Sequence, residues 1–262
     1  MPENRGFVTF GGLVFGAAVV LWAHVSMGGS LRTFAQVEAL AVVFGGTAAA
    51  LMVSFPTRAL RSCLTGIRDL FSGQAVPLES MVPTFIGFAR KAKKHGLAAL
   101  ERDLDASHDP FLVRAVSVSL AGLPAQVVRE ALEIDARVLA EREEERAQVL
   151  EAAAGYAPTL GIVGAVLGLM RVMQAFSSSP TFGAGIAAAF VATILGVGAA
   201  NLVFLPLATR LRARARQEQL RRELVIDGVL ALRDGTSPGV LEERLAGYLT
   251  LRRTGATYAE VA

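Results

Sequence analysis

Four long runs of apolar residues decide what this chain can fold into. The runs cover residues 6–27, 34–55, 152–176 and 184–209. Within them, Glu38 and Arg171 are the only acidic or basic side chains apart from one histidine. A bilayer core about 30 Å thick needs roughly 20 apolar residues in a helix, so each run is long enough to cross. The sequence therefore predicts an all-α integral membrane protein with four transmembrane helices.

The composition excludes several other classes of protein. The chain is 53% hydrophobic and only 19% charged, and almost all of the charge lies outside the four runs, which argues against a cytosolic enzyme or a disordered tail. The single cysteine, Cys63, can form no internal disulfide. The first run is too long for the apolar part of a signal peptide, and only Arg5 among basic residues precedes it. We therefore expect an uncleaved hairpin of two spans.

The distribution of basic residues predicts the topology. Arginine and lysine gather between the second and third runs and again in the stretch 210–216, whereas the turn 28–33 has only Arg32 and the turn 177–183 has none. Cytoplasmic loops carry the excess of basic residues in membrane proteins. We expect both termini and the long middle segment in the cytoplasm, with the two short turns outside. This also accounts for the net charge of +3 without invoking nucleic acid.

The chain divides into four predicted parts. They are the first two transmembrane helices (1–55), a helical cytoplasmic domain (56–151), the third and fourth transmembrane helices (152–209) and a helical cytoplasmic stem and tail (210–262). Helices are expected at 78–106 with an interruption at Gly96, at 125–151 running without a break into the third span, at 207–234 and at 238–252. Asp109-Pro110 is typical of a helix start, and residues 234–238 are typical of a turn.

The third and fourth spans are rich in small residues. Gly161, Gly164 and Gly168 follow one another at intervals of three and four, which makes one face of the third span nearly smooth. In lipid, helices associate by close packing of such residues. Two explanations stay open: the faces pack within this chain, or they face another chain or a pore. The extent of the smooth surface favours an oligomer.

Polar groups inside the spans are few. Pro158 and Pro206 each remove a backbone donor, as a static kink or as a hinge, and counting from the ends of the runs places them at similar depth. The deeper polar side chains are Thr47, Thr159, Thr193 and Asn201. A proton path normally needs a carboxylate within the membrane, and the third and fourth runs contain none. Any titrating carboxylate must then come from another chain.

The sequence has no recognisable catalytic or metal-binding pattern. It contains no phosphate-binding loop, no nucleophile elbow and no histidine and cysteine cluster at metal-ligand spacing. Gly11-Gly12 and Gly45-Gly46 lie within apolar spans, where no phosphate could bind. We expect a protein that is not an enzyme and that binds no cofactor.

Five motifs, in order along the chain, resemble those of the MotA/PomA family, the ion-channel subunits of the bacterial flagellar stator within the MotA/TolQ/ExbB superfamily. They are Ala41–Leu51 followed by Phe55-Pro56, Ala92–Glu101 followed by Asp109-Pro110-Phe111, Ala157–Leu169, Asn201 with Pro206–Leu211, and Asp227-Gly228 with Arg233–Pro238. The resemblance covers nearly the whole chain. It departs at Ala121-Gly122, where many members have Asp-Gly.

The resemblance implies roles for individual residues. Pro158, Ala165, Thr193 and Pro206 would line the ion pathway. Sodium-driven members have a threonine at the position of Ala165, and alanine offers no oxygen ligand, so the implied ion is the proton. Lys93 and Glu101 would contact the rotor, although lysine at the first position replaces the family's arginine and lacks its planar fork.

The resemblance also implies an assembly. The chain would form a homo-oligomer, by analogy a pentamer, in the bacterial inner membrane around single-span, peptidoglycan-binding MotB-like subunits that supply a membrane aspartate, and it would turn a FliG-like rotor protein. Two alternatives stay open. An ExbB/TolQ-type subunit would power an outer-membrane system but has one span before its large cytoplasmic domain. A structural scaffold would conduct nothing.

Overall fold

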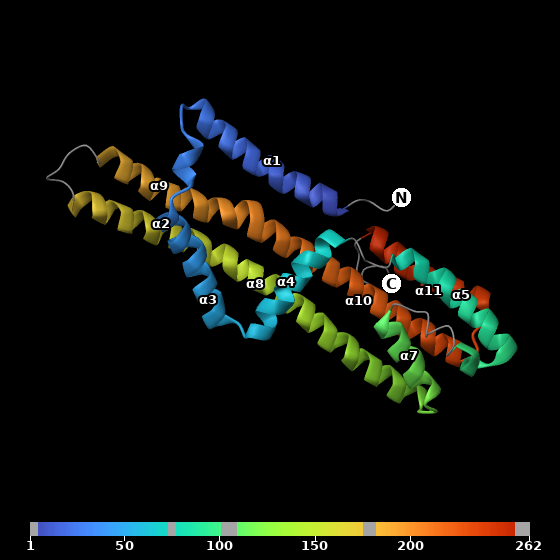
Figure 1. Cartoon of the computed structure of the whole chain (residues 1–262). Helices are drawn as coiled ribbons and strands as arrows, with labels where there is room; N and C mark the ends of the chain where they lie inside the picture. Colours follow the sequence, from blue (N-terminus) through green and yellow to red (C-terminus); the bar gives the residue numbers. More distant parts are fainter. Residues whose placement is uncertain (1–4, 73–76, 101–108, 175–181, 255–262) are drawn as a thin grey trace. The chain divides into compact units, whose positions relative to one another are not determined.

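The computed structural model describes residues 5–72, 77–100, 109–174 and 182–254, and within these ranges the chain forms helices and no strands. It divides into two compact units. The first joins Met1–Gln74 to Glu143–Arg212, and the second joins Ala75–Arg142 to Ala213–Ala262. Two long helices, α8 (Ala125–Gln174) and α10 (Leu205–Arg233), contribute to both units (Figure 1).

The first unit holds the apolar helices. Its elements are α1 (Arg5–Ser26), η1 (Leu31–Phe34), α2 (Val37–Leu40), η2 (Ala41–Gly45), α3 (Gly46–Ser54), α4 (Thr57–Ser72), the second half of α8, α9 (Phe182–Gly198), η5 (Ala199–Phe204) and the start of α10. Among the described residues, three helical stretches are long and apolar enough to cross a membrane: Val37–Ser54 and parts of Ala125–Gln174 and Ala189–Arg233. Residues Phe10–Ser26 form a shorter apolar helix, so the crossing by the first run stays a prediction.

The second and fourth spans each contain a widened, π-helical turn, at η2 and η5. Pro206 is the second residue of α10, two positions after the end of η5. Its ring cannot donate the hydrogen bond that the carbonyl of Leu202 would accept in a regular helix, and it crowds that carbonyl. The wider turn relieves this conflict. In the second span the buried Thr47 hydroxyl donates to the Val43 carbonyl inside η2, at 2.6 Å.

The second unit is a small helical domain with its own core. Its elements are α5 (Leu78–His95), η3 (Leu97–Leu100), α7 (Pro110–Leu120), α11 (Pro238–Thr254) and the adjoining parts of α8 and α10. The largest fully buried side chains of this core are Phe85, Leu100, Leu132, Leu224, Leu241 and Leu245. Helices α5 and α11 lie side by side (Figure 1).

Local sequence signals set most of the helix ends. Asp109 caps α7 by accepting hydrogen bonds from the backbone N–H groups of Phe111 and Leu112, and Pro110 takes the first helical position, as predicted. The expected helix 78–106 stops at His95, because Gly96 has a φ of +78° and the chain turns there. Residues 101–106 of that prediction lie outside the described residues.

The long helix predicted across the boundary of the third span is confirmed. α8 is a single helix of 50 residues that contains both the charged stretch 125–151 and the apolar stretch that follows it. The predicted helices 207–234 and 238–252 correspond to α10 and α11, and Gly235, with a φ of +69°, turns the chain between them.

Asp227-Gly228 has a structural role in the second unit. The Asp227 carboxylate accepts hydrogen bonds from Tyr248 (2.7 Å), from Arg129 (3.4 Å) and, more weakly, from Arg244 (3.5 Å), which joins α8, α10 and α11. Next to it, a methyl group added at Gly228 would lie 2.6 Å from the ring of the fully buried Phe85. The glycine therefore lets α5 approach α10.

Gly228→Ala should destabilise the protein by about 1–3 kcal/mol, because the new methyl group forces the buried Phe85 ring to move. Thermal unfolding of the full chain in mild detergent measures the effect. Gly87→Ala is the matched control, because Gly87 also lies within a helix and an added methyl group there would meet nothing within 4 Å. Alanine has a higher helix propensity than glycine, so this variant should have a raised melting temperature. Equal melting temperatures for the two variants would contradict the packing argument.

Candidate functional site

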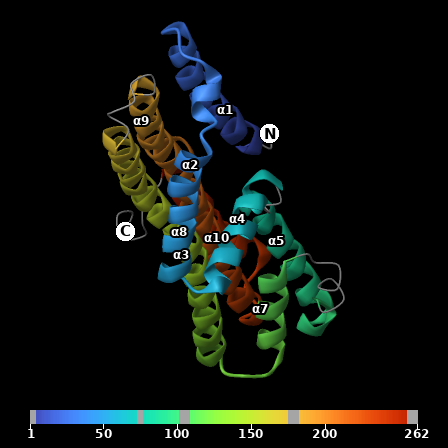
Figure 2. The same ribbon diagram turned by 60° about the vertical axis from the view of Figure 1, so that its left-hand side comes forward.

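The third and fourth spans pack backbone to backbone. A methyl group added at Gly161 would lie 2.8 Å from the carbonyl oxygen of Ala192, and one added at Gly196 would overlap the carbonyl oxygen of Ala157. Neither carbonyl can move away without disturbing its helix. The antiparallel pair α8 and α9, side by side in Figures 1 and 2, is thus held at a separation that only glycine permits at these two positions.

The same contact continues along α8 toward its C-terminal end. Added methyl groups at Gly164 and Gly168 would lie 2.8 Å and 3.0 Å from the Cβ atoms of Ala192 and Ala189. The small-residue stripe of the third span is therefore occupied by the fourth span of the same chain. This decides between the two explanations that the sequence left open: these glycines serve packing within the chain.

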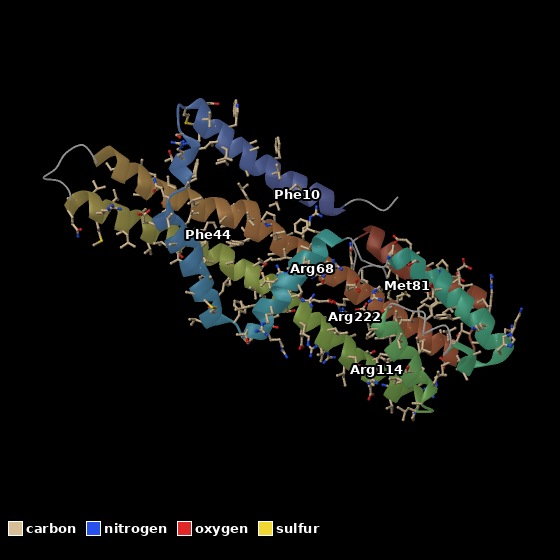
Figure 3. The ribbon with its side chains drawn as sticks, in the orientation of Figure 1. Phe10, Phe44, Arg68, Met81, Arg114 and Arg222 are labelled. Carbon is tan, nitrogen blue, oxygen red and sulfur yellow. The ribbon has the colours of Figure 1, made fainter. Side chains whose placement is uncertain are left out.

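The apolar helices α1 and α3 pack on the third and fourth spans. Gly46 of α3 approaches Leu160 of α8, with 3.0 Å between an added methyl group and the leucine side chain, and Gly16 of α1 approaches Leu202 of η5, at 3.2 Å. Large apolar side chains remain exposed on the outside, among them Phe10 at 60% and Phe44 at 41% (Figure 3). Such surfaces suit lipid or a neighbouring subunit.

Three of the four predicted pathway residues lie on adjacent turns around the Gly161 contact. The Cα atom of Thr193 is 3.3 Å from the position of a methyl group on Gly161. Pro158 and Ala165 lie about one turn on either side of Gly161 in α8. All three are partly buried.

Pro206, also partly buried, lies at a different level, which corrects the expectation of similar depth. Ala157, next to Pro158, is opposite Gly196. Arg212, six residues after Pro206, reaches back to Glu144 and Glu151. This register places Pro206 about two helical turns, roughly 10 Å, nearer to the charged end of α8 than Pro158. Counting from the ends of apolar runs missed this because the run of the third span begins inside a longer helix.

The hydroxyl of Thr193 differs from the other deep polar groups. Thr47 and Thr159 each donate to a carbonyl of their own helix, at 2.6 Å and 2.8 Å, and the Asn201 amide does the same at 2.9 Å. Among the described residues the Thr193 hydroxyl has no such partner. It is therefore the group here that can take up an outside hydrogen-bond partner without breaking an existing bond.

The two charged side chains of the spans form a pair near the C-terminal end of α8 and the start of α2. Arg171 lies 3.9 Å from Glu38, and their side chains are 82% and 80% exposed. Because both side chains are so exposed, this pair supplies no buried carboxylate. The described residues contain no cluster of three or more His, Cys, Asp or Glu side chains that could hold a metal ion.

An ion-pair cluster that the sequence reading missed joins α8 and α10 beyond the spans. The Arg212 guanidinium donates to Glu144 at 2.7 Å and 3.0 Å and to Glu151 at 2.5 Å and 2.9 Å. These hydrogen bonds raise the pKa of Arg212 above its ordinary value, and the bonds to Glu151 contribute more than those to Glu144. The sequence does contain a signal for this cluster, because Glu144 and Glu151 are seven residues apart and share one helix face.

The two predicted rotor-contact residues, Lys93 and Glu101, do not belong to the spans. Lys93 is exposed in the last turn of α5, in the second unit, whereas Glu101 lies outside the described residues. Cys63 is buried in α4 of the first unit, and burial raises the pKa of its thiol to about 11. A thiol so protonated is unreactive at neutral pH.

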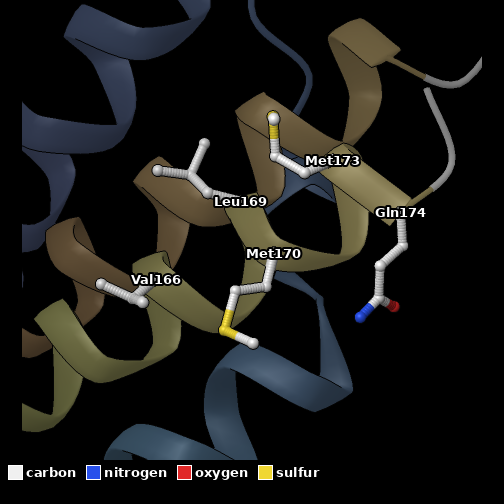
Figure 4. Close-up of a pocket in the computed structure, with 5 residues that line it drawn as sticks. All are labelled: Val166, Leu169, Met170, Met173 and Gln174. Carbon is white, nitrogen blue, oxygen red and sulfur yellow. The ribbon is translucent and has the colours of Figure 1, made fainter.

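Figure 4 shows a shallow hollow on the C-terminal part of α8. Its lining comes from one face of that helix: Val166, Leu169, Met170, Met173 and Gln174. The four apolar side chains are about half exposed or more, and one terminal amide is the only polar side-chain group in the lining. The hollow therefore has the character of a lipid-facing or subunit-facing surface and offers no chemistry for catalysis.

Comparison with known proteins identifies relatives of this chain. Residues 103–224 match the MotA/TolQ/ExbB proton channel family. Motility protein A of Bacillus subtilis is 31% identical over 91% of this chain and 88% of that protein. Chemotaxis protein PomA of Vibrio alginolyticus is also 31% identical, over 91% of this chain and 93% of its own length. The solved flagellar MotAB stator complex from Bacillus subtilis superposes with a TM-score of 0.84 at 30% identity, covering 92% of this chain and 95% of that chain.

Gly196→Ala should separate α8 from α9 and lower the stability of the spans by about 1–3 kcal/mol, because its methyl group would overlap the Ala157 carbonyl. Gly198→Ala is the control: it lies two residues further on, and an added methyl group there meets nothing within 4 Å. Melting temperature and size-exclusion profile in detergent compare the two. If Gly196→Ala has the same melting temperature as Gly198→Ala, the backbone contact does not hold α8 and α9 together.

Proposed function

Because the chain belongs to the MotA/PomA family of flagellar stator subunits, we propose that it converts ion flow across the membrane into torque together with a single-span partner of the MotB type. It is the oligomer-forming, multi-span subunit of that complex. Its third and fourth spans form the wall of the ion path. Its second unit belongs to the part that acts on the rotor.

The proposal rests on the Thr193 hydroxyl, a polar group in a wall that has no carboxylate of its own. Thr193 lies beside the rigid contact of α8 and α9, and its hydroxyl has no hydrogen-bond partner among the residues that the structure describes. Neither the third nor the fourth span has a carboxylate. The partner then supplies an aspartate that is protonated and released in turn. A charged carboxylate in the membrane costs at least a few kcal/mol, so each protonation changes the energy of the complex by enough to drive a step.

The transported ion in this proposal is the proton. Ala165 lies one turn from the Thr193 contact, and its methyl side chain gives no oxygen ligand for sodium, a cation that is bound through oxygen atoms. No cofactor enters the cycle. Pro158 and Pro206, at two levels of the wall, are the points at which α8 and α10 lack a regular helical hydrogen bond.

The assembly that follows is a ring of five copies around two partner subunits in the bacterial inner membrane. Both termini and the segment 56–151 lie in the cytoplasm, as the basic residues favour. Lys93, exposed in α5, and Glu101 contact a rotor protein of the FliG type through opposite charges. Surface charge pairs of this kind guide partners together and are weakened by salt.

The two rival functions are less well supported. An ExbB/TolQ-type subunit has one span before its cytoplasmic domain, whereas two apolar helices precede that domain here. Motility protein A of Bacillus subtilis and chemotaxis protein PomA of Vibrio alginolyticus match this chain over most of their length. A scaffold that conducts nothing would need the glycine contacts but would have no use for the Thr193 hydroxyl.

Thr193→Ala should abolish or strongly reduce swimming while leaving expression and assembly unchanged, because it removes the hydroxyl from the wall. Swimming speed of cells, with co-purification of the partner, measures both. Thr193→Ser keeps the hydroxyl and should restore motility. Thr159→Ala is the control, since Thr159 bonds its own helix. Normal swimming by Thr193→Ala would favour the scaffold.

Lys93→Glu should reduce torque without changing ion flow, because the residue belongs to the second unit and not to a span. Torque is measured from the rotation of tethered cells, and ion flow from the cytoplasmic pH of cells that overproduce the complex. Lys94→Glu alters the net charge equally from an adjacent exposed position and should have the smaller effect on torque. An equal loss from both would mean that general charge, not this contact, matters.

A further inference from the structure

Helix α4 begins where the second span leaves the bilayer. The span Val37–Ser54 has 18 residues, or about 27 Å of helix, close to the thickness of the hydrocarbon core. Phe55 is extended, with φ −129° and ψ 143°, as a residue before proline tends to be. α4 starts at Thr57, so its first turn lies at the level of the lipid headgroups.

The inner face of α4 is packed against the ends of the other spans. Ala59, Cys63 and Gly66, at intervals of four and three, are buried on it. Their cluster is completed by residues of α8, α10 and α1: Ala147, Leu150, Leu207, Ala208, Leu211 and, at its edge, Leu13. A helix that touches the neighbouring span helices near one level runs along the membrane surface rather than away from it.

Polar contact fixes the same face. The Arg146 side chain of α8 donates to the Ser62 hydroxyl at 2.7 Å. A methyl group at Gly66 would lie 3.1 Å from the Arg146 Cδ atom. The rotation of α4 about its own axis is therefore determined, and with it the direction of the opposite face.

That opposite face is a basic stripe, which we define as Arg58, Arg61 and Arg68. The intervals of three and seven put the three residues on one side of the helix. All are exposed, and none has a hydrogen bond or ion pair with another described residue (Arg68 is labelled in Figure 3). Leu64, 68% exposed, and Phe71, 41% exposed, flank the stripe. Asp69, the one acidic residue of α4, is half-buried and has an interaction of its own.

We propose that the basic stripe of α4 binds the headgroups of anionic phospholipids in the leaflet that the second span leaves. Each guanidinium can hold a lipid phosphate through two parallel hydrogen bonds. Leu64 and Phe71 enter the boundary between headgroups and acyl chains, as apolar residues of surface helices do. This surface goes beyond the ion path and the rotor contact, and it rests on the proposed membrane topology only.

Lipid binding at this stripe would act on the wall indirectly. α4 is joined through Ser62 and Gly66 to Arg146 of α8, and through the buried cluster to α10. Anchoring α4 in the headgroup layer thus steadies the level at which α8 and α10 leave the membrane. Arg58, Arg61 and Arg68 are positioning residues in this sense and take no part in ion transfer.

Native mass spectrometry of the complete stator complex tests the proposal. The complex, in mild detergent, is titrated with phosphatidylglycerol and, separately, with phosphatidylcholine of the same chain length. The variant Arg61→Gln/Arg68→Gln should bind phosphatidylglycerol about thirtyfold more weakly, since a basic residue at the surface contributes about 1 kcal/mol toward anionic lipid. Arg137→Gln/Arg142→Gln removes the same charge from exposed positions of α8 and should bind like the unchanged complex.

Three results would overturn the proposal. They are equal binding of the two lipids by the unchanged complex, unaltered phosphatidylglycerol binding by the α4 variant, and loss of subunits from that variant with lipid binding intact, which would mean that the stripe faces a neighbouring copy. These outcomes are independent of the proposed function. A stator that swims normally and needs Thr193 can fail the lipid test, and a lipid-binding scaffold can pass it.

Discussion

The structure depends on one contact, the backbone-to-backbone approach of α8 and α9 at Gly161 and Gly196. Lipid supplies no hydrophobic force between helices, so their association relies on close packing over a long line. The glycines provide that line, and the carbonyls of Ala157 and Ala192 lie where any side chain would collide. The position of Thr193, the level of Pro158 and the outward direction of the large apolar side chains all follow from this register.

The two ion-pair clusters around Arg212 and Asp227 lie outside the spans, where they hold the long helices in register without burying charge in lipid. Arg212 binds Glu144 and Glu151 in the first unit, and Asp227 binds Arg129 and Tyr248 in the second. Each joins α8 or α10 to another helix of the same unit. Because α8 and α10 are continuous through both units, a change at Pro158 or Pro206 occurs on the same helices that carry these anchors.

Much of the fold could be predicted from the sequence because its signals are local or periodic. The apolar runs, the cap at Asp109, the turn at Gly235 and the unbroken helix 125–174 need no knowledge of distant contacts. The register of α8 on α9 could not be read in this way, and the levels of the two prolines were therefore wrong. The pairing of Arg212 and the contact of Gly228 with Phe85 were missed for the same reason, since both join residues far apart in the sequence. The candidate site was identified through resemblance, and its roles stay predictions.

Disulfide cross-linking in membranes tests the central claim that the Thr193 side of α9 faces the carboxylate of the partner. In a Cys63→Ser background the chain carries Thr193→Cys, and the partner carries a cysteine in place of its membrane aspartate. The account predicts a cross-link between the two chains, and little from Ile194→Cys, which is 45% exposed but lies about 100° around the helix. A cross-link from Ile194→Cys and none from Thr193→Cys would contradict it.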